Sequence, residues 1–129
     1  MIQEDYCSYE LSQLLKEKGF KGVCEYAYSN KGNYFKVDRG NFDEVYCLRP
    51  THQMACAWLR KNYNLHVCPK LVCFRGAKKY DKEYYKWEDR VLRLPTNNQV
   101  HPQFMVHEYY NTYEEAVEAA LKYSLENLI

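Results

Sequence analysis

The sequence lacks several of the patterns by which enzymes, secreted proteins and membrane proteins are usually identified. None of its six cysteines belongs to a Cys-x-x-Cys pair, which argues against zinc-ribbon and thioredoxin-type sites. There is no run of about 18 apolar residues, so no membrane span is predicted. The first residues are acidic and include no apolar core, so we expect no signal peptide and a cytoplasmic protein whose thiols stay reduced.

The chain also carries almost no net charge and contains no glycine-rich loop. The 129 residues include 18 basic and 17 acidic ones, for a net charge of +1, which argues against a protein drawn to nucleic acid or membranes by its overall charge. Only five residues are glycine and none forms a Gly-rich loop, so a doubly wound nucleotide-binding sheet is not expected. The carboxylates fall into no paired acid–base arrangement. We therefore expect no cofactor, no metal and, on balance, no catalytic activity.

Tyrosine is the residue type that the sequence has in abundance. It occupies 14 positions, and aromatic residues make up 16% of the chain. Its ring is apolar and its tip is polar, so it suits both half-buried strands and contact surfaces. A chain of 129 residues has the size of one domain and hides roughly two-thirds of its unfolded surface without disulfides. We predict a single α+β domain over residues 1–129.

Three segments have the pattern of helices. Residues 5–18 place apolar side chains at helical spacing, and Gly19 is positioned to end the helix. Residues 51–63 form the second helix, capped by its first residue. The third begins at Thr112, whose hydroxyl forms a capping box with Glu115.

The segments between the helices have the composition of strands. "VCEYAYS", "YFKV" and "EVYCL" indicate three short strands, the first two joined by the turn signal "NKGN". Pro69 cannot donate a ladder hydrogen bond, so the next strand, over 65–74, is an edge strand or contains a bulge. Further strands are predicted at 84–94 and 103–110. The order αβββα-βββ-α predicts an α+β fold, a mostly antiparallel sheet of about five or six strands with three helices packed on it.

His52 and Cys56 stand four residues apart on the second helix, a spacing that brings side chains together. A nucleophile and its base would also need an orienting group and an oxyanion hole. A metal site would need two further ligands, from Cys47, His66 or Cys68. The alternative, which we favour, is that Cys56 packs as a small hydrophobe and His52 lies in a polar first turn. The other histidines and cysteines are assigned to core or surface positions.

The stretch from residue 70 to residue 93 is the best case for a binding surface. It contains eight basic and four acidic residues, with aromatic residues among them. Basic groups for phosphate and rings for stacking are typical of a single-strand nucleic-acid platform. They are equally typical of a solvated hairpin with one apolar and one charged face, which we favour because the acidic residues are interspersed. The candidate binding residues are Lys78, Lys79, Tyr80, Tyr84, Lys86 and Arg90.

Three segments of the sequence carry a family resemblance. "YCSYELSQLLKEKGF", "PTHQMACAWLRKNYNLHV" and "YEEAVEAALKYSLENLI" resemble a family of small uncharacterised proteins encoded by gut anaerobic bacteria and their prophages. That family has no assigned activity and no catalytic motif, so it implies no functional residue in this chain. It implies a cytoplasmic accessory protein of a phage or mobile element.

We therefore expect a small non-enzymatic protein-interaction or regulatory module whose partner is another protein. The alternative is a weak binder of single-stranded nucleic acid that uses residues 75–93. A third, lesser hypothesis is a cysteine-dependent enzyme with Cys56 as nucleophile and His52 as base. No membrane partner is expected, and the sequence leaves a homo-oligomer open.

Overall fold

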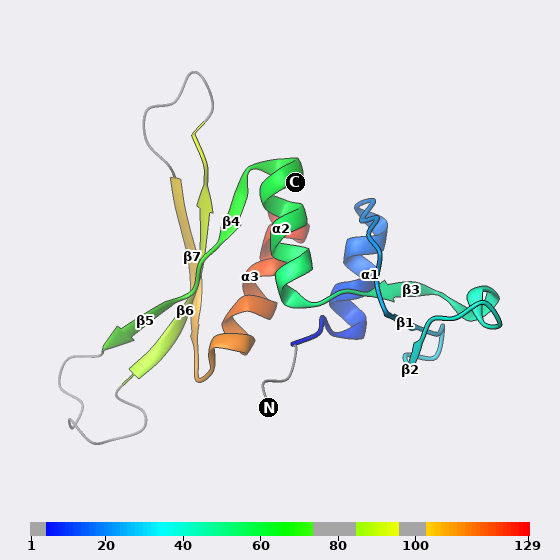
Figure 1. The fold of residues 1–129 in the computed structure, drawn as a ribbon. Coiled ribbons are helices and arrows are strands. Elements are labelled where there is room, and N and C mark those ends of the chain that lie inside the picture. The colour runs from blue at the N-terminus through cyan, green and yellow to red at the C-terminus, as the bar shows by residue number, and fades with distance from the viewer. Residues whose placement is uncertain (1–4, 74–84, 96–102) are drawn as a thin grey trace. The chain divides into compact units, whose positions relative to one another are not determined.

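Three helices and seven strands in two antiparallel sheets make up the computed structural model, which describes residues 5–73, 85–95 and 103–129 (Figure 1). The predicted α+β class is therefore confirmed. The chain groups into an N-terminal unit, Met1–Trp58, and a C-terminal unit, Leu59–Ile129, and each contains one of the sheets. The strands thus form two sheets in place of the expected one. The single domain over 1–129 stays a prediction.

The sheet of the N-terminal unit has three short strands in the order β2-β1-β3. β1 (Tyr26–Tyr28) is central and pairs antiparallel with β2 (Tyr34–Lys36) and β3 (Cys47–Arg49). Gly32, at φ +86°, supplies the left-handed residue of the turn between β1 and β2. A 3-10 turn, η1 (Phe42–Glu44), lies in the loop that leads to β3.

Helix α1 (Tyr9–Glu17) is set by a cap at each end. The Ser8 hydroxyl accepts a hydrogen bond from the Leu11 N–H at 3.1 Å. At the other end the Phe20 N–H donates to the Leu15 carbonyl at 2.9 Å, while Gly19 adopts φ +88°. This is a Schellman stop, so the predicted end of the helix is confirmed.

A short extended segment before α1 pairs with the chain just before the second helix. The Cys7 N–H donates to the Pro50 carbonyl at 2.9 Å, and the His52 N–H donates to the Asp5 carbonyl at 2.8 Å. These bonds keep the segment extended, so α1 begins later than predicted. They also place Tyr6 beside the tyrosines of β1.

Helix α2 (His52–Tyr63) begins where the sequence predicts it. The Thr51 hydroxyl accepts a hydrogen bond from the Met54 N–H at 3.1 Å, as an N-cap does. Asn64 follows the last turn at φ 56°, a left-handed conformation that asparagine tolerates better than most residues. The boundary between the two units falls within this helix.

In the C-terminal unit, Pro69 divides the strand predicted over 65–74. Its halves are β4 (Leu65–Val67) and β5 (Lys70–Cys73), and both pair antiparallel with β6 (Tyr85–Arg93). Val67 pairs with Val91 and Lys70 with Glu88, so the register does not shift between the two halves. The missing N–H of proline interrupts the ladder without moving it, as expected of an edge strand.

The opposite edge of β6 pairs with β7 (Gln103–Tyr110). The register shifts between Glu88 and Arg90, where β7 carries one extra residue. At this bulge the Asp89 Oδ1 atom accepts a hydrogen bond from the Glu108 N–H at 2.7 Å. Asp89 is only 2% exposed, so a buried carboxylate holds the irregular part of the sheet.

Helix α3 (Tyr113–Asn127) begins with the predicted N-cap at Thr112. The Thr112 hydroxyl accepts a hydrogen bond from the Glu115 N–H at 3.1 Å, as in the first half of a capping box. The Glu115 carboxylate accepts from the Thr112 hydroxyl at 3.0 Å, whereas the full box would have it accept from the Thr112 N–H. One face packs against β4, β6 and β7, and its buried residues are Ala116, Val117, Ala120, Leu121, Ser124 and Leu125. Among the described residues, no helix has both the length and the apolar character that crossing a membrane requires.

Candidate functional site

Only part of the predicted binding surface falls on described residues. Lys86 and Arg90 lie on β6 and are half-buried. The Lys86 ammonium donates a hydrogen bond to the Asn111 side-chain oxygen. The other four predicted residues lie outside the described part of the chain: Lys78, Lys79, Tyr80 and Tyr84. Nucleic-acid binding through 75–93 therefore stays a prediction.

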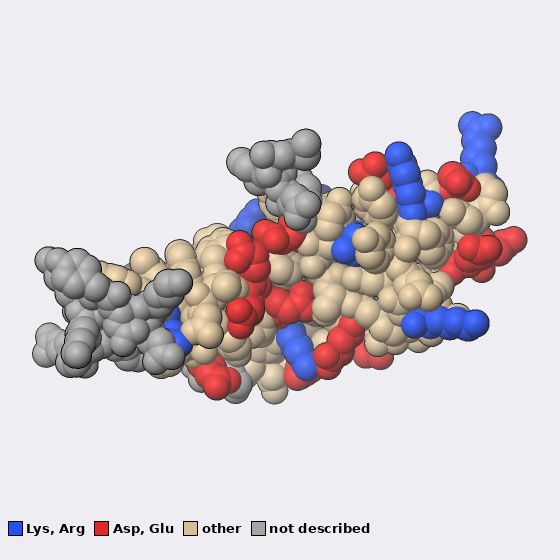
Figure 2. All heavy atoms as spheres, turned by 90° about the horizontal axis from the view of Figure 1, so that it is seen from below, with Lys and Arg blue, Asp and Glu red and all other residues tan. Residues whose placement is uncertain are grey.

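The two faces of β6 differ in character. Trp87 packs edge-on against Tyr113 of α3, with ring centroids 5.2 Å apart, and Val91 on the same face is buried. Lys86 and Arg90 alternate with these residues and belong to the other face. On the side of the molecule drawn in Figure 2, the described Lys and Arg side chains stand apart, with acidic groups among them. The described residues on this one face therefore form no continuous basic stripe of the kind typical of nucleic-acid binders.

His52 and Cys56 both lie on α2, where Cys56 is buried and His52 is half-buried. Within residues 5–73, 85–95 and 103–129, no three or more His, Cys, Asp or Glu side chains are grouped as they would be to hold a metal ion. All six cysteines are free thiols. The nucleophile–base hypothesis for this pair stays a prediction.

The aromatic side chains of the N-terminal unit converge on Arg49. Its guanidinium carbon lies 3.9 Å from the ring centroid of Tyr34 and 4.2 Å from that of Tyr6. The rings of Tyr28 and Tyr26 follow at 5.7 and 5.8 Å. All four fall within the roughly 6 Å over which a ring attracts a cation. We refer to these four tyrosines and Arg49 as the tyrosine–arginine cluster.

Strand register accounts for most of the cluster. Side chains alternate between the faces of a strand, so Tyr26 and Tyr28 share one face of β1. Tyr34 of β2 lies opposite Tyr28, and Arg49 of β3 lies opposite Tyr26, so both join that face. Tyr6 is added by the extended segment before α1, and its ring centroid is 5.5 Å from that of Tyr26.

Tyr28 anchors the cluster to the core. It is 6% exposed, and its hydroxyl donates to the Cys7 carbonyl at 2.7 Å. The same hydroxyl accepts a hydrogen bond from Arg49 Nε at 3.2 Å. A guanidinium has five N–H groups, and the other four of Arg49 meet no hydrogen-bond acceptor among the described residues. The cation is therefore held in place while most of its donors remain available.

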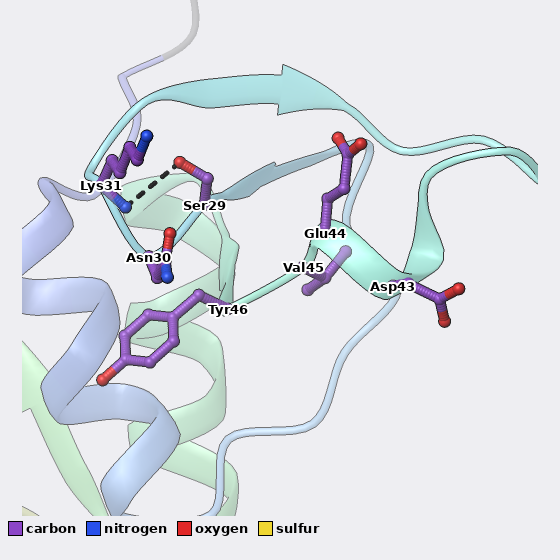
Figure 3. Close-up of a pocket in the computed structure, with 7 residues that line it drawn as sticks. All are labelled: Ser29, Asn30, Lys31, Asp43, Glu44, Val45 and Tyr46. Atoms are coloured by element: carbon purple, nitrogen blue, oxygen red, sulfur yellow. Dashed lines mark hydrogen bonds between the residues drawn. The ribbon is translucent and has the colours of Figure 1, made fainter.

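A pocket of about 450 Å³ lies elsewhere in the N-terminal unit (Figure 3). Within it the Lys31 N–H donates to the Ser29 hydroxyl at 3.3 Å. The carboxylates of Asp43 and Glu44 point away from each other in Figure 3, so they do not form the close pair that shared acid–base work requires. The lining residues are Ser29, Asn30, Lys31, Asp43, Glu44, Val45 and Tyr46.

Comparisons with protein-family models, with curated proteins and with solved structures find no match to this chain. The resemblance to the prophage-encoded family therefore stays a prediction. Function must then follow from the geometry of the residues themselves.

The sequence did not lead to Arg49, Tyr6 or Tyr34 as functional residues. One signal was present, because the alternation of Tyr26 and Tyr28 beside the turn "NKGN" predicts tyrosines on one face of a hairpin. The pairing of β3 with β1, which delivers Arg49, has no comparable local signal.

Proposed function

We propose that this protein is a non-enzymatic protein-interaction module that acts through the tyrosine–arginine cluster. The observation that carries the proposal is the Arg49 guanidinium, whose central carbon lies 3.9 Å from the ring centroid of Tyr34 and 4.2 Å from that of Tyr6. Within the described residues, only its Nε atom has a hydrogen-bond partner. Tyrosine and arginine are among the residue types that dominate binding energy at protein interfaces. An arginine already held by rings loses little side-chain freedom when a partner binds, which favours affinity.

The chemistry of the cluster favours an acidic partner group. A planar guanidinium matches a carboxylate through two parallel hydrogen bonds, and such bonds are stronger than those between neutral groups. Tyr34 is 60% exposed, so its outer ring face offers apolar contact beside that carboxylate. The proposed partner is a protein segment that presents an Asp, a Glu or a C-terminal carboxylate next to an apolar side chain.

The proposal includes a cellular setting. A module of this kind would act in the cytoplasm, where its six thiols stay reduced. The family resemblance supports an accessory protein of a phage or mobile element. A second copy of the chain is one candidate partner, since exposed Asp and Glu side chains occur on this protein as well.

Affinity capture with matched variants tests the proposal. The bait proteins are the wild type, Tyr34→Ala, Arg49→Gln and, as control, Phe42→Ala. Phe42 is 63% exposed and belongs to the same unit but not to the cluster. We expect one partner to be retained by the wild type and by Phe42→Ala, and to bind at least about tenfold more weakly to the two cluster variants.

Two further measurements separate binding from folding. Circular dichroism checks that each variant is folded. Arg49→Lys tests whether a planar donor is required, because lysine keeps the positive charge but lacks the paired N–H groups of a guanidinium. We expect Arg49→Lys to bind nearly as weakly as Arg49→Gln. Equal capture by Tyr34→Ala and the wild type, with both folded, would show that the cluster is not the interface.

A further inference from the structure

A second pocket, of about 230 Å³, lies between α1 and the start of β3. Its walls come from one face of α1, where Ser12 and Lys16 are one turn apart, and from the chain that enters β3. The lining residues are Ser12, Lys16, Phe20, Val45, Tyr46, Cys47 and Leu48. All of them belong to the N-terminal unit, so the pocket is built within one unit.

Ser12 is the unusual residue of this pocket. It is 1% exposed, yet its hydroxyl has no hydrogen-bond partner among the described residues. A buried helical serine normally bonds back to the preceding turn, as Ser124 does when it donates to the Ala120 carbonyl at 2.8 Å. A buried polar group without a partner is costly, so an unmatched hydroxyl that lines a pocket points to a ligand that matches it.

The polar side chains of the pocket are donors. Lys16 donates to the Tyr46 carbonyl at 2.5 Å and lies 4.2 Å from the centre of the Tyr46 ring, which holds its ammonium in place. An ammonium has three N–H groups, so others remain for a ligand. Cys47 is 3% exposed, and burial raises the pKa of its thiol against the opposing effect of Lys16, so the thiol is protonated at neutral pH. The lining contains no Asp or Glu.

We propose that this pocket binds a small apolar carboxylate. The acid group would accept hydrogen bonds from Ser12 Oγ and Lys16 Nζ, and the apolar body would pack against Phe20 and Leu48. The volume of about 230 Å³ is below the range of about 300–1,000 Å³ typical of drug-sized ligands, so the occupant is a short-chain or single-ring acid. This site is separate from the tyrosine–arginine cluster and does not depend on its role.

Protection of Cys47 provides a position-specific test. The whole chain is titrated with sodium benzoate, or with benzamide as the neutral isostere, at constant ionic strength. Iodoacetamide labelling of each cysteine is then followed by peptide mass spectrometry. We expect benzoate to slow labelling of Cys47 but not of Cys73, which is exposed and lies outside the pocket. Benzamide should bind about tenfold more weakly because it lacks the charge-assisted bonds.

Three variants locate the ligand. Ser12→Ala should weaken benzoate binding roughly tenfold while leaving the unfolding midpoint unchanged or raised, because the hydroxyl has no partner to lose. Lys16→Gln should weaken binding by about three- to fivefold, as expected for a partly exposed ion pair. Lys18→Gln, an exposed lysine of the same segment that does not line the pocket, should bind like the wild type.

Each other result overturns the proposal. Benzoate that leaves Cys47 labelling unchanged, or that slows all six cysteines equally, shows that the pocket takes no carboxylate. Wild-type affinity in Ser12→Ala shows that the buried hydroxyl is not a ligand contact. Benzoate binding that is lost in Arg49→Gln but kept in Ser12→Ala places the acid at the tyrosine–arginine cluster and away from this pocket.

Discussion

Asp89 offers the sharpest test of how the C-terminal unit is held together. Its carboxylate is 2% exposed and accepts the Glu108 N–H at 2.7 Å, at the bulge of β7. A hydrogen bond to a charged acceptor contributes about 1.5–3 kcal/mol to stability. Glu108 is itself exposed, so water can replace part of the lost bond. We therefore expect Asp89→Ala to lower the free energy of unfolding by about 2 kcal/mol.

Two companion variants test whether the loss comes from the hydrogen bond, from the negative charge, or from the removal of any acid in this part of β6. Asp89→Asn keeps an oxygen that can accept the Glu108 N–H, so the loss should be about 1 kcal/mol or less. Glu88→Ala removes the neighbouring acid on the other face of β6 and should change stability by no more than about 0.5 kcal/mol.

Urea unfolding followed by the fluorescence of Trp87 is the assay, because this ring packs on Tyr113 within the same unit. A Trp58→Phe background leaves Trp87 as the single tryptophan. Amide hydrogen exchange at Glu108 gives a local readout, which should lose protection in Asp89→Ala. An Asp89→Ala protein within about 0.5 kcal/mol of the wild type, with Glu108 still protected, would refute the reasoning.

Three other changes have expected outcomes that urea unfolding can check. Thr112→Ala should cost about 1 kcal/mol because it removes the N-cap of α3; a Thr112→Ser protein that is equally destabilised would argue against capping. Gly19→Ala should also cost about 1 kcal/mol because alanine disfavours φ +88°, whereas the added Cβ has space, with no atom within 4 Å beyond the glycine and its two chain neighbours; Gly19→Asn should cost less. Burial raises the thiol pKa of three cysteines above its ordinary value, so these thiols ionise first in the unfolded chain: Cys24, Cys47 and Cys68. Their contribution to stability should be complete well below the unfolded thiol pKa of about 8.5, and the free energy of unfolding should fall as the pH rises above that value. Replacing the three cysteines by alanine should make this fall smaller.

The elements of the fold are well predicted where a single residue imposes a local conformation. Gly19 ends α1 because a left-handed residue is required there, and Thr112 begins α3 because its hydroxyl meets an otherwise unpaired N–H. Pro69 marks the break between β4 and β5 because it lacks a donor. In each case the physical cause lies within a few residues in sequence, so a reading of the sequence can reach it.

Features that depend on contacts between distant parts of the chain are harder to predict from the sequence. Asp89 stands between two charged neighbours in the sequence, yet it is buried, and its Oδ1 atom accepts the Glu108 N–H at the bulge of β7. The division of the strands into two sheets is likewise decided by contacts between residues that are distant in sequence. Which strand pairs with which depends on contacts between distant residues, and alternation within a strand does not encode its neighbour.

The candidate site shows the consequence for function. The density of basic and aromatic residues between 70 and 93 predicts a binding surface there, but β6 divides its own basic and aromatic residues between a packed face and a charged face. The tyrosine–arginine cluster has no such density, since it combines Tyr6, Tyr34 and Arg49 from three separate segments. Residues that follow one another along a strand point to opposite faces, whereas residues brought opposite each other by register share one. A search by local density therefore favours solvated strands, and the preorganised cation of this protein becomes visible only once the pairing of β1 with β2 and β3 is known.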